Sequence, residues 1–344
     1  MPTFRRSRLP AAALVLPFVI ACEPSPTPQP GASSRIVVYC SVDEAFALHV
    51  LKRYERENDV KLDVIYDSEA GKTTGLVKRI IAEARSGRPR ADLFWSSELF
   101  QTIRLAELGF LSPYASPLAA DIPERYRDPD GYWTALAARA RVLAFDPTVV
   151  DTDKLPTHWE QLADEPFVSQ TSIANPLFGT TRGHVAAMFV LWGSQRARQF
   201  LTRLHDGGIL ISAGNSSAVR AVIAKRVKYA ATDTDDVWVA QRAGASLDLR
   251  YLDLGDGGTL LIPCSVSLVR GGPNQREARK LVDYLVSSQV ERMLAESDSR
   301  NIPVRASLRR QLGVTWPPES KVNFDAVADA MKEAERAVRE ILIR

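Results

Sequence analysis

Two hydroxyl side chains open a predicted helix near the middle of the chain, and their position suits anion binding. Residues 173–184 are predicted to run from the end of a short strand, through a loop, into a helix that ends before Gly193. Gly179 permits a tight turn, and Thr180 and Thr181 lie where the first N–H groups of a helix have no intrahelical partner. Such a turn binds anions, but Thr is also a common helix cap. Asn175 either contacts the same ligand or only orients this turn.

An acidic turn follows another predicted strand further along the chain. Residues 229–236 are predicted to be a strand, then the turn Thr232-Asp-Thr-Asp-Asp236, then a helix that contains Trp238. We expect Thr234, Asp235 and Asp236 to face a ligand, since carboxylates bind cations and ammonium groups. The alternative is that both acids only cap the helix.

Polar loops also follow three predicted strands in the first hundred residues. The strands span residues 35–40, 61–66 and 91–95, and helices are predicted between them. Alternating strands and helices imply a parallel sheet, and ligands of such sheets bind beyond the carboxyl ends of the strands. We therefore expect ligand contacts from the loop residues Ser41, Asp43, Thr73, Thr74, Ser97 and Glu98. For Thr73, Thr74 and Glu98, helix capping is the competing interpretation.

The order of the elements predicts a two-lobed α/β protein. A turn-rich stretch leads to a strand-like crossing at residues 138–145, and the apolar run 259–269 is predicted to cross back. Helices are predicted after it over residues 275–288, 289–296 and 321–342. The N-terminal lobe is predicted to comprise residues 35–137 plus 260–344, and the C-terminal lobe residues 138–259. We expect two mixed or parallel sheets, flanked by helices and joined by a hinge, with the ligand in the cleft.

The composition is that of a globular protein without an electrostatic preference for nucleic acid. The 344 residues are 45% hydrophobic and 25% charged, with a formal net charge of +3. The three arginines at positions 5, 6 and 8 account for that excess, because 41 basic and 41 acidic residues remain without them. A neutral remainder gives no reason to expect nucleic-acid binding.

The first 34 residues read as a targeting segment and a tether. Three arginines precede an apolar run that is too short to span a bilayer as a mature helix. Residues 19–22, Val-Ile-Ala-Cys, resemble a bacterial lipobox, which predicts a signal peptide at 1–22 and lipidation of Cys22. The Pro/Ser-rich stretch 23–34 suits a tether. We therefore expect an extracytoplasmic protein that is anchored to a membrane by lipid.

Cysteines and catalytic motifs argue against metal-cluster or enzyme chemistry. Cys40 and Cys264 lie near the ends of two predicted strands, so two buried thiols are favoured over a disulfide, which export would permit. No Gly-x-Ser-x-Gly, His-Glu-x-x-His or phosphate-loop motif is present. We expect no enzymatic activity and no cofactor.

Residues 35–305 resemble bacterial periplasmic solute-binding proteins of the ferric-iron-binding type, which are the receptors of ABC importers. The resemblance depends on the order and spacing of several short motifs: Val37-Val-Tyr-Cys-Ser41, Ala91-Asp-Leu-Phe-Trp-Ser-Ser-Glu98, Ala174-Asn-Pro with Gly179-Thr-Thr181, the acidic turn, Gly258-Thr-Leu-Leu-Ile-Pro263 and Asn301-Ile-Pro303. It implies a two-lobed type II binding-protein fold, a permease as partner and a monomeric receptor.

The resemblance leaves two ligands open. Ferric-binding members use adjacent tyrosines where this chain has residues 232–236, and they often bind an anion near the segment that matches 179–181. Without the tyrosines, Asp43, Asp235 and Asp236 are the candidate ligands of a ferric ion, since carboxylates are hard donors. The alternative is an organic phosphate or phosphonate such as 2-aminoethylphosphonate, with its oxyanion on the hydroxyls and its ammonium on the acids. Iron with an anion is slightly favoured by its frequency in the family. A protein-binding envelope lipoprotein is the third alternative.

Four further side chains are less favoured as ligand contacts. Tyr66 and Trp95 are predicted to lie in the core. His184 lies in the first turn of a helix, which is a poor position for a cation. Arg182 is near enough to reach an anion, but it also suits a solvated surface position.

Overall fold

The computed structural model describes residues 35–67, 73–315 and 317–343. The predicted signal peptide (1–22), the lipidation site Cys22 and the tether (23–34) lie outside the described residues. No helix in the described part of the chain is long and apolar enough to cross a membrane.

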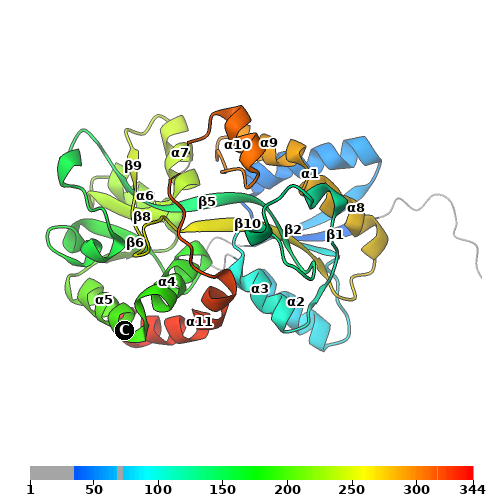
Figure 1. The fold of residues 1–344 in the computed structure, drawn as a ribbon, viewed down its shortest axis with the longest axis horizontal. Coiled ribbons are helices and arrows are strands. Elements are labelled where there is room, and N and C mark those ends of the chain that lie inside the picture. Colours follow the sequence, from blue (N-terminus) through cyan, green and yellow to red (C-terminus); the bar gives the residue numbers. More distant parts are fainter. Residues whose placement is uncertain (1–34, 68–72, 316, 344) are drawn as a thin grey trace, which may run out of the picture. The chain divides into compact units, whose positions relative to one another are not determined.

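The strands and helices alternate through most of the chain (Figure 1). The strands are β1 Arg35–Cys40, β2 Lys61–Tyr66, β3 Leu93–Ser96, β4 Leu111–Ser112, β5 Thr134–Phe145, β6 Thr171–Ala174, β7 Leu210–Ser212, β8 Tyr229–Asp233, β9 Asp248–Tyr251 and β10 Leu261–Val269. The α-helices are α1 Glu44–Asn58, α2 Thr74–Arg85, α3 Phe100–Glu107, α4 Gly179–Trp192, α5 Ser194–Asp206, α6 Asn215–Ile223, α7 Thr234–Arg242, α8 Gln275–Leu285, α9 Ser288–Glu296, α10 Ala306–Leu312 and α11 Phe324–Ala337, which a π-helical turn extends over Val338–Leu342.

Most predicted elements are present, and the differences at their ends have local causes. The helix predicted over 321–342 begins only at Phe324, because the side chain of Asn323 accepts a hydrogen bond from the N–H of Ala326 and caps it. The helix predicted over 275–288 ends at Leu285, and Ser287 caps the next helix, α9. Helix α1 forms as expected, with Ala47, Val50, Leu51 and Tyr54 on its buried face.

The sheet is mixed, and β5 joins its two parts. The strand order is β2-β1-β3-β10-β5-β8-β6-β7. Strands β1, β2 and β3 are parallel, as are β6, β7 and β8, whereas β10 and β5 run antiparallel to their neighbours. The first part of β5 pairs with β10 and the second part with β8 and β9. The predicted crossing at 138–145 pairs with both β10 and β8, and the strand begins four residues earlier than predicted, at Thr134.

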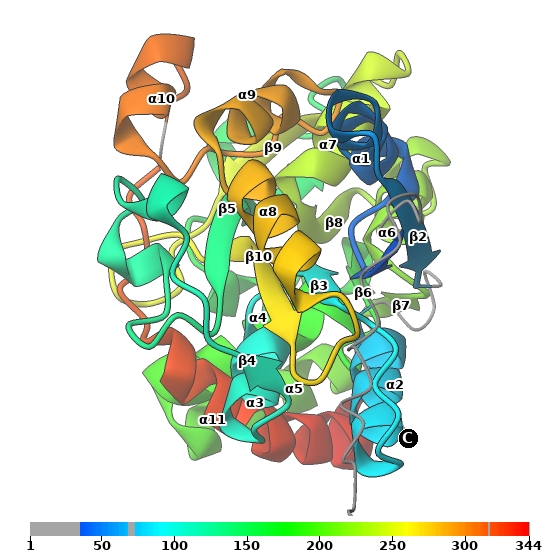
Figure 2. The ribbon, with the colours of Figure 1, turned by 90° about the vertical axis from the view of Figure 1, so that its right-hand side faces the viewer.

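Helices cover both faces of the part of the sheet that contains β1–β3. Helices α1, α8 and α9 lie on one side of these strands, and α2 and α3 lie on the other (Figures 1 and 2). Strand β1 is accordingly apolar along most of its length, since both of its faces are buried: Ile36, Val38, Tyr39 and Cys40 have no exposed surface. Their carboxyl ends carry the polar loops that the sequence singled out.

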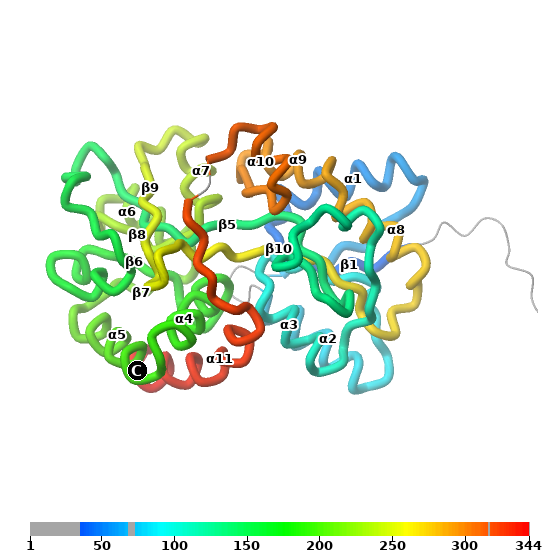
Figure 3. The backbone as a smooth tube through the Cα atoms, viewed as in Figure 1, coloured from blue at the N-terminus to red at the C-terminus, as the bar shows by residue number. Residues whose placement is uncertain are grey.

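The C-terminal segment packs against both predicted lobes. The chain passes from α10 to α11, which lies beside α3 and α4, and the π-helical turn after α11 lies beside α5 (Figure 3). Arg182 in α4 forms an ion pair with Glu335 in α11 at 2.9 Å, and the rings of Phe100 in α3 and Phe324 in α11 are 5.9 Å apart. The sequence-based assignment of residues 260–344 to the N-terminal lobe does not foresee this contact, and the lobe boundaries themselves stay a prediction.

Cys40 and Cys264 are both buried, and no disulfide joins them. The favoured expectation of two buried thiols is confirmed. Burial raises the pKa of the Cys264 thiol to about 11, so this thiol stays protonated at neutral pH.

Candidate functional site

The three polar loops after β1, β2 and β3 meet at one edge of the sheet. The hydroxyl of Thr73 lies 3.1 Å from that of Ser41 and 3.2 Å from that of Ser97, and the last two are 3.3 Å apart. All three side chains are buried. The parallel strands thus bring the loops together as expected, but the hydroxyls of Ser41 and Thr73 bond to their neighbours, and only Ser97 also lines the pocket described below.

Two other predicted contacts in these loops have structural partners. The carboxylate of Glu98 accepts hydrogen bonds from the N–H groups of Phe100 (2.9 Å) and Gln101 (3.4 Å) and so caps α3. Burial raises its pKa to about 7 against the opposing effect of Arg182 and these bonds. The hydroxyl of Thr74 accepts a bond from the amide of Gln101. The capping interpretation therefore describes the contacts of Glu98.

A pocket that is partly open to solvent lies between these loops and the starts of α4 and α6. Seven of the predicted contacts line it: Asp43, Ser97, Asn175, Gly179, Thr180, Thr181 and Asp236. Its other lining residues are Arg139, Ala174, Phe178, Ala213, Gly214, Asn215 and Ser216. The remaining predicted contacts are not among its lining residues and are Ser41, Thr73, Thr74, Glu98, Thr234 and Asp235.

The first turns of two helices open onto this pocket. Gly179 begins α4 with φ +54°, a conformation that favours glycine. The first intrahelical bonds join Arg182 N–H to Phe178 O and Ala218 N–H to Gly214 O. The N–H groups before Arg182 and Ala218 therefore have no acceptor in their own helix, and they carry the positive ends of two helix dipoles. Both helices follow parallel strands, β6 and β7, which aligns their starts at one edge.

Arg139 supplies a cation to the same pocket. This residue of β5 is only 7% exposed and lines the pocket. Its Nη1 lies 3.0 Å from Oδ2 of Asp235, and its Nη2 donates to the carbonyl oxygen of Ser97. Its Nε has no hydrogen-bond partner among the described residues. Burial alone would lower the pKa of Arg139, but Asp235 and Asp233 raise it, so the guanidinium stays charged.

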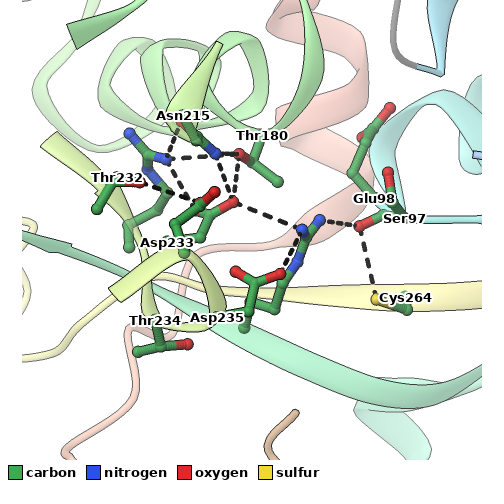
Figure 4. Close-up of polar contacts among 12 residues, drawn as sticks. Ser97, Glu98, Thr180, Asn215, Thr232, Asp233, Thr234, Asp235 and Cys264 are labelled. Carbon is green, nitrogen blue, oxygen red and sulfur yellow. Dashed lines mark hydrogen bonds and ion pairs between the residues drawn. The ribbon is translucent and has the colours of Figure 1, made fainter. Parts of the chain in front are cut away.

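A buried hydrogen-bond network lies behind the pocket, as Figure 4 shows around Asp233. Oδ2 of Asp233 accepts bonds from the hydroxyl of Thr180 (2.6 Å) and the amide of Asn215 (2.8 Å). Oδ1 accepts from Nη1 of Arg141 at 2.7 Å. Burial alone would raise the pKa of Asp233, but Arg141 and Arg139 lower it, so this carboxylate is ionised. Arg141 and Asp233 are cross-strand partners on β5 and β8 and have no exposed surface.

The acidic turn divides into residues with different surroundings. Asp235 is buried and paired with Arg139, and its pKa is raised by burial and by the nearby charges of Asp233 and Asp43, against the effect of Arg139. Asp236 lines the pocket and accepts a bond from the hydroxyl of Thr232 at 3.0 Å. Thr234 is fully buried and accepts a bond from the N–H of Ala140.

One group of acids has the spacing that a metal ion requires. Asp233, Asp235 and Asp236 each offer a carboxylate oxygen within 4.8 Å of the others. Asp43, the third acid of the sequence-based metal set, lines the pocket instead. Two of the three grouped carboxylates already have guanidinium partners, Asp233 with Arg141 and Asp235 with Arg139.

The four less favoured side chains lie outside the lining of this pocket. Trp95 is fully buried and Tyr66 is partly buried against the core. Arg182 pairs with Glu335. His184 is buried, accepts a bond from Nε of Arg141 at 3.3 Å, and packs edge-on against Trp159. Burial and Arg141 hold the pKa of His184 well below its usual range, so the ring is neutral.

Sequence reasoning missed the charged residues of β5. Arg139 and Arg141 stand in an otherwise apolar strand, and a buried arginine requires an acidic or carbonyl partner. Their spacing of two places both side chains on one face of the strand. This pattern was the available signal for a charged site. Asp233 is the matching acid in β8, and Asn215 opens α6.

Solved structures share this fold. An iron-bound HitA of Pseudomonas aeruginosa is 22% identical, with a TM-score of 0.75 over 89% of this chain and 99% of that one. A ferric-binding protein of Campylobacter jejuni is 19% identical, with a TM-score of 0.79 over 89% and 99%. AfuA of Actinobacillus pleuropneumoniae, with fructose-6-phosphate bound, is 20% identical, with a TM-score of 0.76 over 90% and 98%. The fold is thus that of a two-lobed, type II periplasmic binding protein, as the sequence predicted.

Residues 89–328 match the family described as bacterial extracellular solute-binding protein, and the chain belongs to this family. Its relatives include an uncharacterized protein of Haemophilus influenzae, 26% identical over 90% of both chains. Iron uptake protein A1 of Synechocystis sp. is 24% identical over 90% of this chain and 88% of its own. A putative 2-aminoethylphosphonate-binding periplasmic protein of Salmonella typhi is 24% identical over 68% of both chains. The resemblance predicted from the sequence motifs is confirmed.

Proposed function

We propose that this chain is the solute receptor of an ABC importer and that its pocket binds a small ligand through an oxyanion. Membership of the solute-binding family supports the first part, and one relative, from Sinorhizobium fredii, is named as a probable ABC transporter periplasmic-binding protein. The observation that carries the second part is the presence of Arg139 beside the first turns of α4 and α6 in one pocket.

Each component of the pocket suits an oxyanion for a stated reason. Helices α4 and α6 have 14 and 9 residues, so each has a full set of N-terminal N–H groups without intrahelical acceptors. Arg139 adds a charged donor whose Nε lacks an acceptor among the described residues. Hydrogen bonds from charged donors to oxyanions are about twice as strong as neutral ones.

The acids of the pocket favour a ligand that also carries a cationic group. Asp43 and Asp236 line the same pocket as Arg139. An organic phosphonate or phosphate with an ammonium group would place its oxyanion on the helix starts and its ammonium on these carboxylates. The relative that is named for 2-aminoethylphosphonate supports this ligand class.

A ferric ion held together with an anion is the second candidate. Asp233, Asp235 and Asp236 offer hard oxygen donors at a suitable spacing, and two relatives from Synechocystis are named iron uptake proteins. A ferric ion at these acids would lie next to Arg139 and would compete with it for Asp235. This charge conflict is why the geometry favours the organic oxyanion.

The ligand contacts in this proposal are the predicted residues that line the pocket, together with Arg139 and the start of α6. The ligand lies between lobes 35–137 plus 260–344 and 138–259, and closure about the crossing strands holds it. Cys22 carries the lipid anchor, residues 23–34 form the tether, and the monomeric receptor delivers its ligand to a permease outside the cytoplasm. The protein releases its ligand chemically unchanged.

A thermal-shift panel tests this function. The ligands are 2-aminoethylphosphonate, inorganic phosphate, glucose 6-phosphate and ferric citrate. A ligand at 100 times its Kd stabilises the native state by about 2.7 kcal/mol, which raises the Tm by several degrees. Stabilisation by a phosphonate or phosphate supports the proposal, stabilisation by ferric citrate alone supports the second candidate, and an unchanged Tm with all four contradicts both.

A further inference from the structure

We infer that Asp233 is a positioning residue that joins the N-termini of α4 and α6 into one anion site, through Thr180 and Asn215. This inference rests on the proposed function for its ligand but not for its geometry. The network comes from four separate segments of the chain: β5, α4, α6 and β8.

The hydrogen bonds of Thr180 leave no donor for a ligand. Its hydroxyl donates its single proton to Oδ2 of Asp233 at 2.6 Å. The hydroxyl oxygen of Thr180 accepts a bond from Nδ2 of Asn215 at 3.0 Å. Although Thr180 lines the pocket, its side chain therefore fixes α4 to β8, and a bound oxyanion is met by main-chain N–H groups instead.

The side chain of Asn215, at the start of α6, likewise has all its donors bonded within the network. Its Nδ2 donates to Thr180 and to Asp233, which uses both protons of the amide. Its Oδ1 accepts bonds from the hydroxyl of Thr181 (3.3 Å) and from Nη1 of Arg141 (3.4 Å). The two helix starts are thus tied to each other as well as to Asp233.

Arg141 is the counter-ion that permits an ionised Asp233 at full burial. Its Nη1 lies 2.7 Å from Oδ1 of Asp233, and its Nε donates to the neutral His184. A buried carboxylate without this partner would carry a large desolvation penalty. For the same reason, a substitution of Asp233 leaves Arg141 uncompensated and endangers the fold, so the test uses Thr180.

The test compares Thr180→Val, Thr180→Ser and a matched control, Thr102→Val. Valine preserves the shape of threonine but removes the hydroxyl, whereas serine retains it. Thr102 is also buried, and its hydroxyl accepts a hydrogen bond from that of Ser265 at 2.9 Å, but it lies in α3 outside the pocket lining. Thr102→Val thus measures what a buried threonine-to-valine change does by itself.

The first readout is amide hydrogen exchange at Arg182 in α4 and Ala218 in α6, whose N–H groups form the first intrahelical bonds. Thr180→Val is expected to speed exchange at both amides about tenfold, because this is the typical effect of losing one buried hydrogen bond. Thr180→Ser and Thr102→Val are expected to leave both rates unchanged. Faster exchange at Arg182 alone, or the same effect from Thr102→Val, would overturn the inference.

The second readout is calorimetric titration with 2-aminoethylphosphonate and with inorganic phosphate. If the wild type binds either probe, Thr180→Val should weaken its affinity about tenfold and Thr180→Ser should restore it; equal affinities would overturn the inference. If the wild type binds neither probe, the choice of ligand in the proposed function is wrong, and the exchange rates still decide whether Asp233 joins the two helices.

Discussion

Arg139 and Asp235 form a buried ion pair, with 3.0 Å between Nη1 and Oδ2, at the wall of the pocket. Arg139 comes from β5 and Asp235 from the first turn of α7, and the same guanidinium also donates to the carbonyl oxygen of Ser97. Arg139 lines the pocket, whereas Asp235 is not among the lining residues. Asp235 therefore competes with any bound oxyanion for the charge of Arg139.

This competition predicts that Asp235→Asn strengthens the binding of an oxyanion. Removal of a negative charge a few ångströms from the anion should raise its affinity about tenfold, as Coulomb's law gives for a partly screened site. Isothermal titration with 2-aminoethylphosphonate at constant ionic strength measures the change. The exposed Asp248→Asn serves as the control for a lost surface charge. A ferric ligand would show the opposite sign, and weaker binding of the phosphonate would contradict the competition.

The stability of the protein should depend on the ionisation of Glu98. Burial raises its pKa to about 7 in the folded state, against 4.5 as the reference value. The folded state therefore binds this proton more tightly, so the contribution to stability is fully present below pH 4.5 and is lost as the pH rises through 7. The wild type therefore loses up to about 3 kcal/mol of its free energy of unfolding as Glu98 ionises, and Glu98→Gln does not undergo this loss.

Thermal unfolding of the wild type and Glu98→Gln between pH 4 and pH 8 checks this dependence. Glutamine still offers an oxygen to the N–H of Phe100, so the cap is retained. The Tm of the variant relative to the wild type should increase with pH. If the Tm difference between the variant and the wild type stays constant or decreases from pH 4 to pH 8, the ionisation of Glu98 does not destabilise the folded state.

Close packing between α4 and α3 should make Gly183 intolerant of a side chain. A Cβ at Gly183 would lie 2.3 Å from Cδ2 of the buried Phe100 ring. Overpacking of this kind costs about 1–3 kcal/mol, more than the gain of about 1 kcal/mol that alanine brings to a helix. Urea unfolding of Gly183→Ala should show a net loss of stability.

A double-mutant cycle with Phe100→Leu identifies the cause of that loss. The smaller leucine leaves room for the new methyl group, so Gly183→Ala should cost less in the Phe100→Leu background. Additive losses in the double variant would mean that the clash with Phe100 is not responsible.

The sequence predicted the order of elements because local patterns determine most of them. The β-branched runs at β1 and β10, the alternation in β2 and the apolar spacing in α1 are properties of short segments. The packing of α11 against α4 was not predictable, because Arg182 and Glu335 are separated by 153 residues and neither has a distinctive local pattern. The sequence also missed the first four residues of β5, which begins at Thr134, since they follow directly on a turn-rich stretch.

The candidate site was predictable in position but less so in its chemistry. Strand ends and helix starts located the pocket, and so Asp43, Ser97 and Gly179 are among its lining residues. The sequence could not show that the hydroxyl of Thr180 donates its hydrogen bond to Asp233, since that depends on long-range pairing of β5 with β8. Hydroxyls and acids were judged by type, whereas their neighbours decide which of them remain available to a ligand.

The most direct measurement is the affinity of Arg139→Gln/Asp235→Asn for 2-aminoethylphosphonate, compared with Asp235→Asn alone. The double variant removes both members of the ion pair and so leaves no uncompensated charge from it. Calorimetry should show that Asp235→Asn binds the phosphonate at least as tightly as the wild type. The double variant should bind it about a hundredfold more weakly than Asp235→Asn. Thermal melting checks that both proteins are folded. Wild-type affinity in the double variant would contradict the claim that Arg139 binds the oxyanion.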